Sequence, residues 1–185
     1  MNFDEIGEMA LGSRLRALSN TLTEDAQQIY QLYDVELKPK WFPVFYFLSN
    51  QNTGVSITTI ANEVGQSHPS IIKIVREMSK AKLVVEQKDE IDGRKNNISL
   101  TEKGLIITSK IQDQYADVES AVKDILDQTK HNIWLALQEF EYLLNEKSLL
   151  KRVVEQKKIR ESSNIEIVDY LPQHHAAFKQ LNEDW

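Results

Sequence analysis

Hydrogen-bond donors are grouped on one face of a helix that the sequence predicts near residues 68–80. With a helical period of 3.6 residues, that face carries Ser70, Lys73 and Arg76, and its N-terminal tip carries His68 and Pro69. Lysine and arginine donate to guanine or to phosphate, and serine and histidine donate at shorter range. Such a face fits the major groove of double-stranded DNA, provided that the preceding residues make the helix project.

The helix predicted near 57–64 and the one that follows it have the spacing of a helix-turn-helix. Helices that cross steeply need a small residue where they touch, here Ala61, and a residue that tolerates positive φ at the turn, here Gly65. Ser67 is a suitable N-cap for the second helix, and Pro69 falls in its first turn. The apolar side chains expected in the shared core are Ile60, Val64, Ile71, Ile74 and Met78. The alternative, an arbitrary pair of amphipathic helices, would rarely combine the small residue, the glycine and the cap.

A charged loop follows between two predicted strands. Lys82–Lys88 alternates as a strand, and the second strand ends at Leu100, so that Asp92, Arg94 and Lys95 lie in the loop beside a glycine. Two cations at the tip of a hairpin suit a contact with the phosphate backbone or the minor groove, whose negative potential attracts arginine. The alternative is a solvated hairpin in which Asp92 and Arg94 only pair with each other. The position of the loop, after a helix-turn-helix, favours a DNA-contacting wing.

Long helices with heptad-spaced apolar residues are predicted at both ends of the chain. The first covers residues 4–33, another begins after Thr101, and the last covers about 131–160, while a short buried helix is expected at 44–48. The apolar stripes are Leu11, Leu15, Leu18 and Leu22, then Ile111, Tyr115, Val118, Val122 and Ile125, and finally Ile133, Leu137, Phe140 and Leu144. Stripes on helices this long usually need more partner surface than one small domain provides. They predict a homodimer formed by both chain ends; the alternative is an intramolecular helical bundle.

The order of these elements resembles the MarR family of transcription regulators, over about residues 4–160. The residues that match the wing signature of that family are Asp92, Arg94, Leu100, Thr101 and Gly104. The resemblance implies a mainly α fold with a small β-hairpin wing, a winged helix-turn-helix with long N- and C-terminal dimerisation helices. It implies a DNA-binding regulator and no enzyme, with Arg94 in the minor groove and Asp92 orienting it. It also implies that the recognition-helix positions are those of Ser67, His68, Ser70, Lys73 and Arg76. The wing departs from the family by its acidic residues, so we expect a modest or salt- and metal-sensitive affinity; these residues are Glu86, Asp89 and Glu90.

The resemblance also implies a place for a small aromatic ligand, because many MarR-like proteins bind phenolic molecules where the dimer helices meet the winged helix. The aromatic residues suited to line that place are Tyr30, Tyr33, Trp41 and Phe45. The alternative is that they are plain core, as aromatic residues at helix junctions often are.

Composition limits the other classes of function. The 185 residues carry a net charge of −6 and no cysteine, which excludes disulfides and thiolate metal sites. The segment 66–82 is locally basic, since four cations outweigh Glu77 to give +3, so DNA binding is permitted. His174 and His175 are adjacent and make a poor chelate, and we expect no metal and no cofactor. The acidic start is not a signal peptide, and the longest apolar run is too short for a bilayer, so a soluble cytoplasmic protein is expected.

The tail, residues 162–185, does not fit the pattern of the first domain, residues 1–161. Residues 165–170 alternate like a strand and 173–185 are expected to be helical, which resembles the first strand and helix of a GNAT-type N-acetyltransferase. The alternative function is therefore the DNA-binding regulatory half of a longer fused regulator and N-acetyltransferase. A winged helix that binds protein rather than DNA is a third option.

Overall fold

The computed structural model describes residues 2–88, 96–163 and 169–183. It divides into two compact units, residues 1–123 and 124–185, each of which is considered by itself. The first unit begins with α1 (Phe3–Ile6), the 3-10 turn η1 (Gly7–Ala10) and α2 (Leu11–Leu32). The single helix expected over 4–33 is thus interrupted, because Gly7 ends α1 with a φ of 67° and a ψ of −146°.

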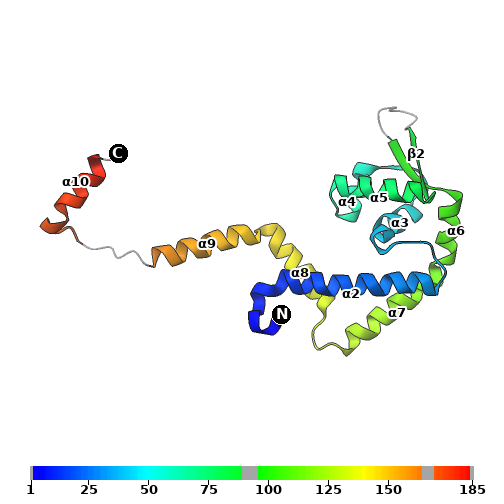
Figure 1. The fold of residues 1–185 in the computed structure, drawn as a ribbon, viewed down its shortest axis with the longest axis horizontal. Helices are drawn as coiled ribbons and strands as arrows, with labels where there is room; N and C mark the ends of the chain where they lie inside the picture. Colours follow the sequence, from blue (N-terminus) through cyan, green and yellow to red (C-terminus); the bar gives the residue numbers. More distant parts are fainter. Residues whose placement is uncertain (1, 89–95, 164–168, 184–185) are drawn as a thin grey trace. The chain divides into compact units, whose positions relative to one another are not determined.

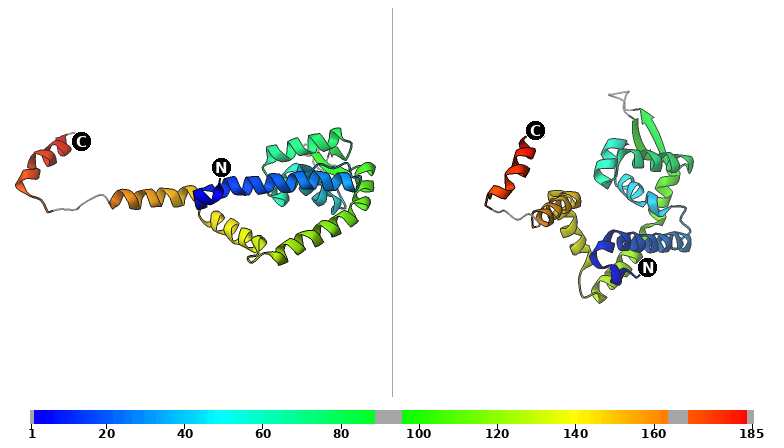
Figure 2. Two further views of the ribbon diagram at one scale, coloured as in Figure 1. Left: turned by 60° about the horizontal axis from the view of Figure 1, so that its bottom comes forward. Right: turned by 60° about the vertical axis from the view of Figure 1, so that its left-hand side comes forward.

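The middle of the chain forms a winged helix (Figure 1). Its elements are η2 (Pro39–Trp41), α3 (Phe42–Ser49), β1 (Val55–Ser56), α4 (Ile57–Val64), α5 (His68–Lys80), β2 (Val84–Lys88) and β3 (Asn96–Leu100). The antiparallel sheet has the order β1-β3-β2, with Val84 opposite Leu100 and Val55 opposite Ile98. The two-residue strand β1 was not predicted, since so short a segment shows no alternation. Figure 1 and the right-hand view of Figure 2 show the β2–β3 hairpin extending beyond the helices α3 to α5.

Apolar side chains from all of these elements meet in one core. The largest that are fully buried are Phe45, Ile60, Ile71, Met78, Leu83, Ile98, Ile111 and Val44. Of the helix-turn-helix residues expected in the core, Ile60, Ile71, Ile74 and Met78 are buried, whereas Val64 is only partly buried against it. The core therefore fixes one face of α5 and leaves the opposite face outside.

Two helices follow the hairpin, α6 (Glu102–Lys110) and α7 (Gln112–Gln128). Thr101 is the N-cap of α6, as predicted, and its Oγ1 accepts from the Gly104 N–H at 3.2 Å. The continuous helix expected from Thr101 onward is divided at Ile111, whose side chain is fully buried.

The second unit holds α8 (Ile133–Glu146), α9 (Leu149–Ser162), η3 (Pro172–His174) and α10 (His175–Glu183). The single helix expected over 131–160 is wrong: Lys147 is extended, and Ser148 caps a new helix by accepting from the Lys151 N–H at 3.4 Å. The heptad stripe that begins at Ile133 lies wholly within α8, so its spacing contains no information about α9.

The helix predicted at 173–185 is confirmed by α10. The predicted strand falls mostly on 164–168, outside the described residues, and Tyr170 is not in a strand. In the described ranges, no helix is long and apolar enough to cross a membrane.

Candidate nucleic-acid interface

The turn of the helix-turn-helix has the geometry that the sequence predicts. Gly65 adopts the left-handed conformation, with a φ of 67° and a ψ of 29°, at the end of α4. The Gln66 N–H donates to the Ala61 carbonyl at 3.0 Å, which closes the helix. Ala61 is 5% exposed, as required of the small residue at the helix crossing. These two residues set the direction in which α5 leaves the turn.

The N-terminus of α5 differs from the prediction in one detail. Ser67 occupies the N-cap position with extended backbone, but its side chain makes no capping hydrogen bond. Instead, the Ser70 hydroxyl in the first turn donates to Gln66 Oε1 at 3.0 Å. Pro69 lies in the first turn, where its missing N–H costs little. Ser67 therefore keeps its hydroxyl outside the capping interaction, while Ser70 is partly engaged within the protein.

The outward face of α5 carries the predicted cations. Lys73 and Arg76 are exposed, as is Lys80 further along the same face. Ser67 and His68 are exposed at the N-terminal tip, while Ser70 is half-buried. The opposite face consists of the buried residues Ile71, Ile74, Val75 and Met78. The structure thus brings four of the five predicted recognition residues to the exposed surface of one helix, with the fifth at its margin.

One flank of α5 contacts the segment before α3, an arrangement that sequence reasoning missed. Glu77 Oε2 accepts from Trp41 Nε1 at 3.0 Å and pairs with Lys40 Nζ at 2.6 Å. Lys38 Nζ lies 5.0 Å from the centre of the Trp41 ring. The hydrogen bond from Lys40, and then that from Trp41, lowers the pKa of Glu77 below its usual value. Trp41 and Glu77 are 36 positions apart in the sequence, and helical periodicity relates only nearby residues. The sequence therefore holds no pattern that predicts this contact.

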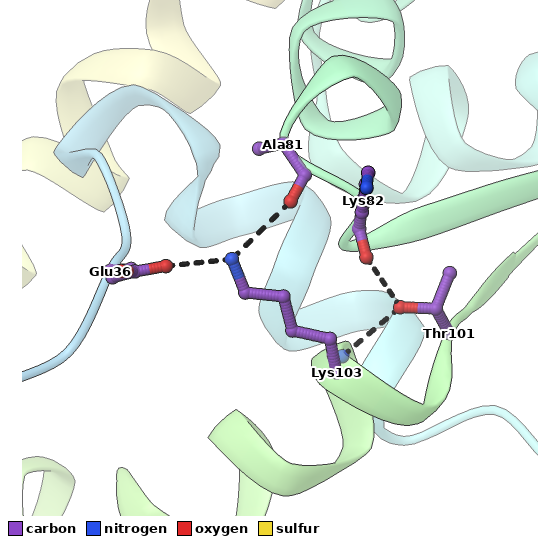
Figure 3. Close-up of polar contacts among 6 residues, drawn as sticks. Glu36, Ala81, Lys82, Thr101 and Lys103 are labelled. Atoms are coloured by element: carbon purple, nitrogen blue, oxygen red, sulfur yellow. Dashed lines mark hydrogen bonds and ion pairs between the residues drawn. The ribbon is translucent and has the colours of Figure 1, made fainter.

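The base of the wing is held by a second polar cluster, drawn in Figure 3. Thr101 Oγ1 donates to the Lys82 carbonyl at 2.6 Å, and Lys82 itself has a positive φ of 60°. Lys103 Nζ donates to Glu36 Oε2 at 2.6 Å and to the Ala81 carbonyl at 3.5 Å. The hydrogen bond from Lys103 lowers the pKa of Glu36. The cluster joins the start of α6 to the strand entry after α5 and to the segment after α2.

The predicted tip of the wing, with Asp92, Arg94 and Lys95, lies outside the described residues. The strands that carry it are described, and Asn96 Nδ2 donates to Glu86 Oε1 across them at 2.6 Å. One of the acidic residues expected to weaken the wing is therefore paired within the hairpin.

Comparison with known proteins agrees with this geometry. Residues 36–95 match the family model described as MarR family. The chain has the MarR-like winged-helix fold. Two of the solved structures that it resembles are the S. aureus MepR–DNA complex and the transcriptional repressor CouR bound to a 23-mer DNA duplex. The first has 18% identity and a TM-score of 0.59 over 73% of this chain and 96% of that chain. The second has 22% identity and a TM-score of 0.59 over 74% of this chain and 96% of that chain.

A third similar structure is the adhesin competence repressor AdcR from Streptococcus pyogenes. It has 20% identity and a TM-score of 0.52 over 74% of this chain and 96% of that chain. No curated protein sequence matches the chain. The likeness to solved structures therefore establishes the MarR-like fold.

Within the MarR-like fold, the aromatic residues predicted to line a ligand pocket lie in the packed core. Tyr30, Trp41 and Phe45 are at most 4% exposed, and Tyr33 packs against the same cluster. Burial raises the pKa of Tyr30 to about 12. The Tyr33 hydroxyl donates to Asp117 Oδ2, which is the first cause of its raised pKa. A role in binding a small aromatic ligand stays a prediction.

The apolar stripes of the MarR-like fold differ in exposure. On α2, Leu11, Leu18 and Leu22 are 39%, 44% and 57% exposed. In the stripe that begins at Ile111, just before α7, Ile111 is fully buried and Tyr115 packs against the core, so its exposed part begins later, with Val122. The leucines of α2 thus form an apolar stripe that the first unit leaves exposed.

Proposed function

We propose that the protein is a homodimeric, sequence-specific DNA-binding transcription regulator that reads the major groove with α5 and contacts the minor groove with its wing. The observation that carries this proposal is the exposed row Lys73, Arg76 and Lys80 on a helix whose opposite face is buried. Two proteins of similar fold, MepR and CouR, are described with bound DNA. Side chains on such a helix reach base edges when the helix lies in the groove.

The charge distribution fits a DNA partner although the whole chain has a net charge of −6. Lys38 and Lys40 lie beside α5, where Glu77 binds Lys40, and they add positive charge next to the cationic row. Contacts with phosphates release counterions, so affinity falls as salt rises.

A dimer is supported by the exposed leucines of α2, since stripes of this kind seek an apolar partner. Two winged helices related by a twofold axis would meet two half-sites about one helical turn apart. We expect selection from random DNA to yield an inverted repeat with this spacing.

Replacing Lys73 with alanine tests the proposed function directly. The affinity for the selected site is expected to fall by about fivefold to about 150-fold, because a base contact contributes about 1–3 kcal/mol. Affinity for unrelated DNA should change little. Fluorescence anisotropy with the selected duplex and a scrambled duplex measures both. The matched control is Lys110→Ala, which removes an exposed lysine of α6 and should affect neither duplex.

Two outcomes would contradict the assignment of Lys73. An equal loss on both duplexes, with a salt slope smaller by about one, would show a phosphate contact instead. Unchanged binding to both duplexes would contradict the assignment of α5 to the DNA interface.

The alternative is that the chain is the regulatory half of a longer regulator and N-acetyltransferase. It is favoured by α10 (His175–Glu183), which lies where the resemblance to the start of an N-acetyltransferase predicts a helix. The tail has its own local packing, with the Tyr170 and Phe178 rings 6.1 Å apart. Intact mass of the natural gene product distinguishes the two forms.

Deleting residues 162–185 is expected to leave DNA affinity within about threefold, less than about 1 kcal/mol. The reason is that the DNA-reading surface and the leucine stripe both lie in the first unit. The remaining chain should not bind acetyl-CoA in calorimetry, and neither should the full chain. A much larger loss of DNA affinity would show that the tail supports the dimer.

A further inference from the structure

Glu77 is a carboxylate on the helix that we assign to DNA reading, where a negative charge is unfavourable. It follows Arg76 directly and lies four residues after Lys73, so it shares their turn of α5. Phosphates of an approaching DNA duplex would repel it. Because Glu77 lowers the affinity for DNA by this repulsion, we expect it to have a structural role, which its contacts indicate.

The contacts of Glu77 fix α5 to the short segment η2. One oxygen, Oε2, accepts from both Trp41 Nε1 and Lys40 Nζ, at 3.0 Å and 2.6 Å. The Glu77 side chain is 27% exposed and Trp41 is 4% exposed, so the indole is a rigid partner rather than a mobile surface group. Charge-assisted hydrogen bonds to such a partner are stronger and more directional than exposed ion pairs.

The segment that Glu77 contacts is also joined to two other helices. Glu36 binds Lys103 of α6, at the base of the wing, and Tyr33 donates to Asp117 of α7. Val35 and Leu37, between these polar residues, are buried in the core. Residues 33–41 therefore contact three helices through polar side chains: α5, α6 and α7.

We propose that Glu77 is a positioning residue for DNA recognition: by binding Trp41 and Lys40 it fixes the rotation of α5, and with it Lys73 and Arg76, relative to the segment that also holds the base of the wing. This inference rests on the proposed function. Its benefit is specificity, since the side chains of α5 meet base edges only when the helix has one fixed orientation in the groove.

Charge and positioning give opposite expectations for the loss of this carboxylate. Removing a negative charge from the interface should by itself raise affinity for any DNA. Losing a fixed orientation should lower affinity for the selected site and leave unrelated DNA unaffected or bound slightly better. The sign of the change on the selected site therefore separates the two explanations.

The experiment compares Glu77→Ala, Glu77→Gln and Lys40→Met with the control Glu63→Ala, which removes an exposed carboxylate of α4. We expect Glu77→Ala to weaken binding to the selected duplex by about tenfold, with binding to a scrambled duplex within about twofold. Glu77→Gln keeps an acceptor for Trp41 and loses the charge for Lys40, so it should rescue part of the loss. The affinity of Glu63→Ala should not fall.

A second readout needs no DNA. In the proton–nitrogen NMR spectrum the indole signal that disappears in Trp41→Phe should move in Glu77→Ala and remain in place in Glu63→Ala. If Glu77→Ala does not fold, Lys40→Met breaks the other half of the contact and should lower specificity in the same direction.

The outcomes separate the two proposals. Wild-type protein that binds no duplex DNA selectively would overturn the proposed function and this inference with it, even if the indole signal moves. Selective wild-type binding with Glu77→Ala unchanged, or tighter on both duplexes, would overturn the positioning role alone. An indole signal that does not move would show that the contact is not made in solution.

Discussion

Replacing Leu18 and Leu22 together with aspartate is expected to convert a dimer to a monomer and to weaken binding to a two-half-site operator by more than about hundredfold. The two leucines are 44% and 57% exposed on α2, one helical turn apart on the same stripe. Two carboxylates buried without partners in an apolar interface cost far more than the apolar contacts that they replace. Each monomer would retain one reading helix, so only weak binding to a single half-site should remain.

Sedimentation velocity at micromolar concentration measures the oligomeric state, and anisotropy measures the affinity. The control is Gln27→Glu with Gln28→Glu, which adds the same two charges at exposed polar positions of the same helix. That variant should remain dimeric and bind the operator. Because both leucines are exposed in the single chain, the thermal midpoint at low concentration should change little. A wild-type protein that sediments as a monomer would contradict the proposed dimer, and a double-aspartate variant that stays dimeric would place the interface elsewhere.

The helix-turn-helix was predictable from sequence because its boundaries depend on local signals. Gly65 is at the end of α4, where a left-handed residue is needed, and Pro69 is in the first turn of α5. The predicted bounds 57–64 and 68–80 are those of the structure. Periodicity also assigned the buried and exposed faces of α5, since a helix of 13 residues covers several turns.

The contacts that orient these elements were not predictable, because they join residues far apart in the chain. The resemblance to the MarR family predicts Trp41 as a residue of a ligand pocket, and nothing in the sequence indicates that its Nε1–H donates to Glu77. Lys103 and Glu36 are 67 positions apart, and neither has a local partner pattern. Heptad spacing failed for a different reason at residue 147, where an extended backbone divides α8 from α9. Such a break depends on a cap at Ser148 and not on the apolar period.

Gly104→Ala is expected to destabilise the protein by about 1–3 kcal/mol, the usual cost of adding a methyl group to a tightly packed site. A Cβ at this position would lie 2.5 Å from the Leu83 carbonyl oxygen and 3.2 Å from two carbon atoms of Leu100. The Leu83 oxygen cannot move freely, because it accepts from the Thr101 N–H at 3.0 Å and Leu83 is fully buried. The added carbon must therefore displace the start of α6 from the strand entry.

Gly12→Ala is the matched control for this substitution, because a Cβ there would meet nothing within 4 Å. Gly12 lies in α2, so alanine should leave stability unchanged or raise it by up to about 1 kcal/mol through helix propensity. The urea midpoint of Gly104→Ala is thus expected to fall, while that of Gly12→Ala stays in place or rises. The Gly104 N–H donates to the capping hydroxyl of Thr101, so Gly104→Ala should also weaken the contacts at the base of the wing. We therefore expect a lower DNA affinity even at temperatures where the variant is still folded. Equal unfolding midpoints for Gly104→Ala and the wild type would show that α6 does not approach Leu83 this closely, and that glycine is needed here for another reason.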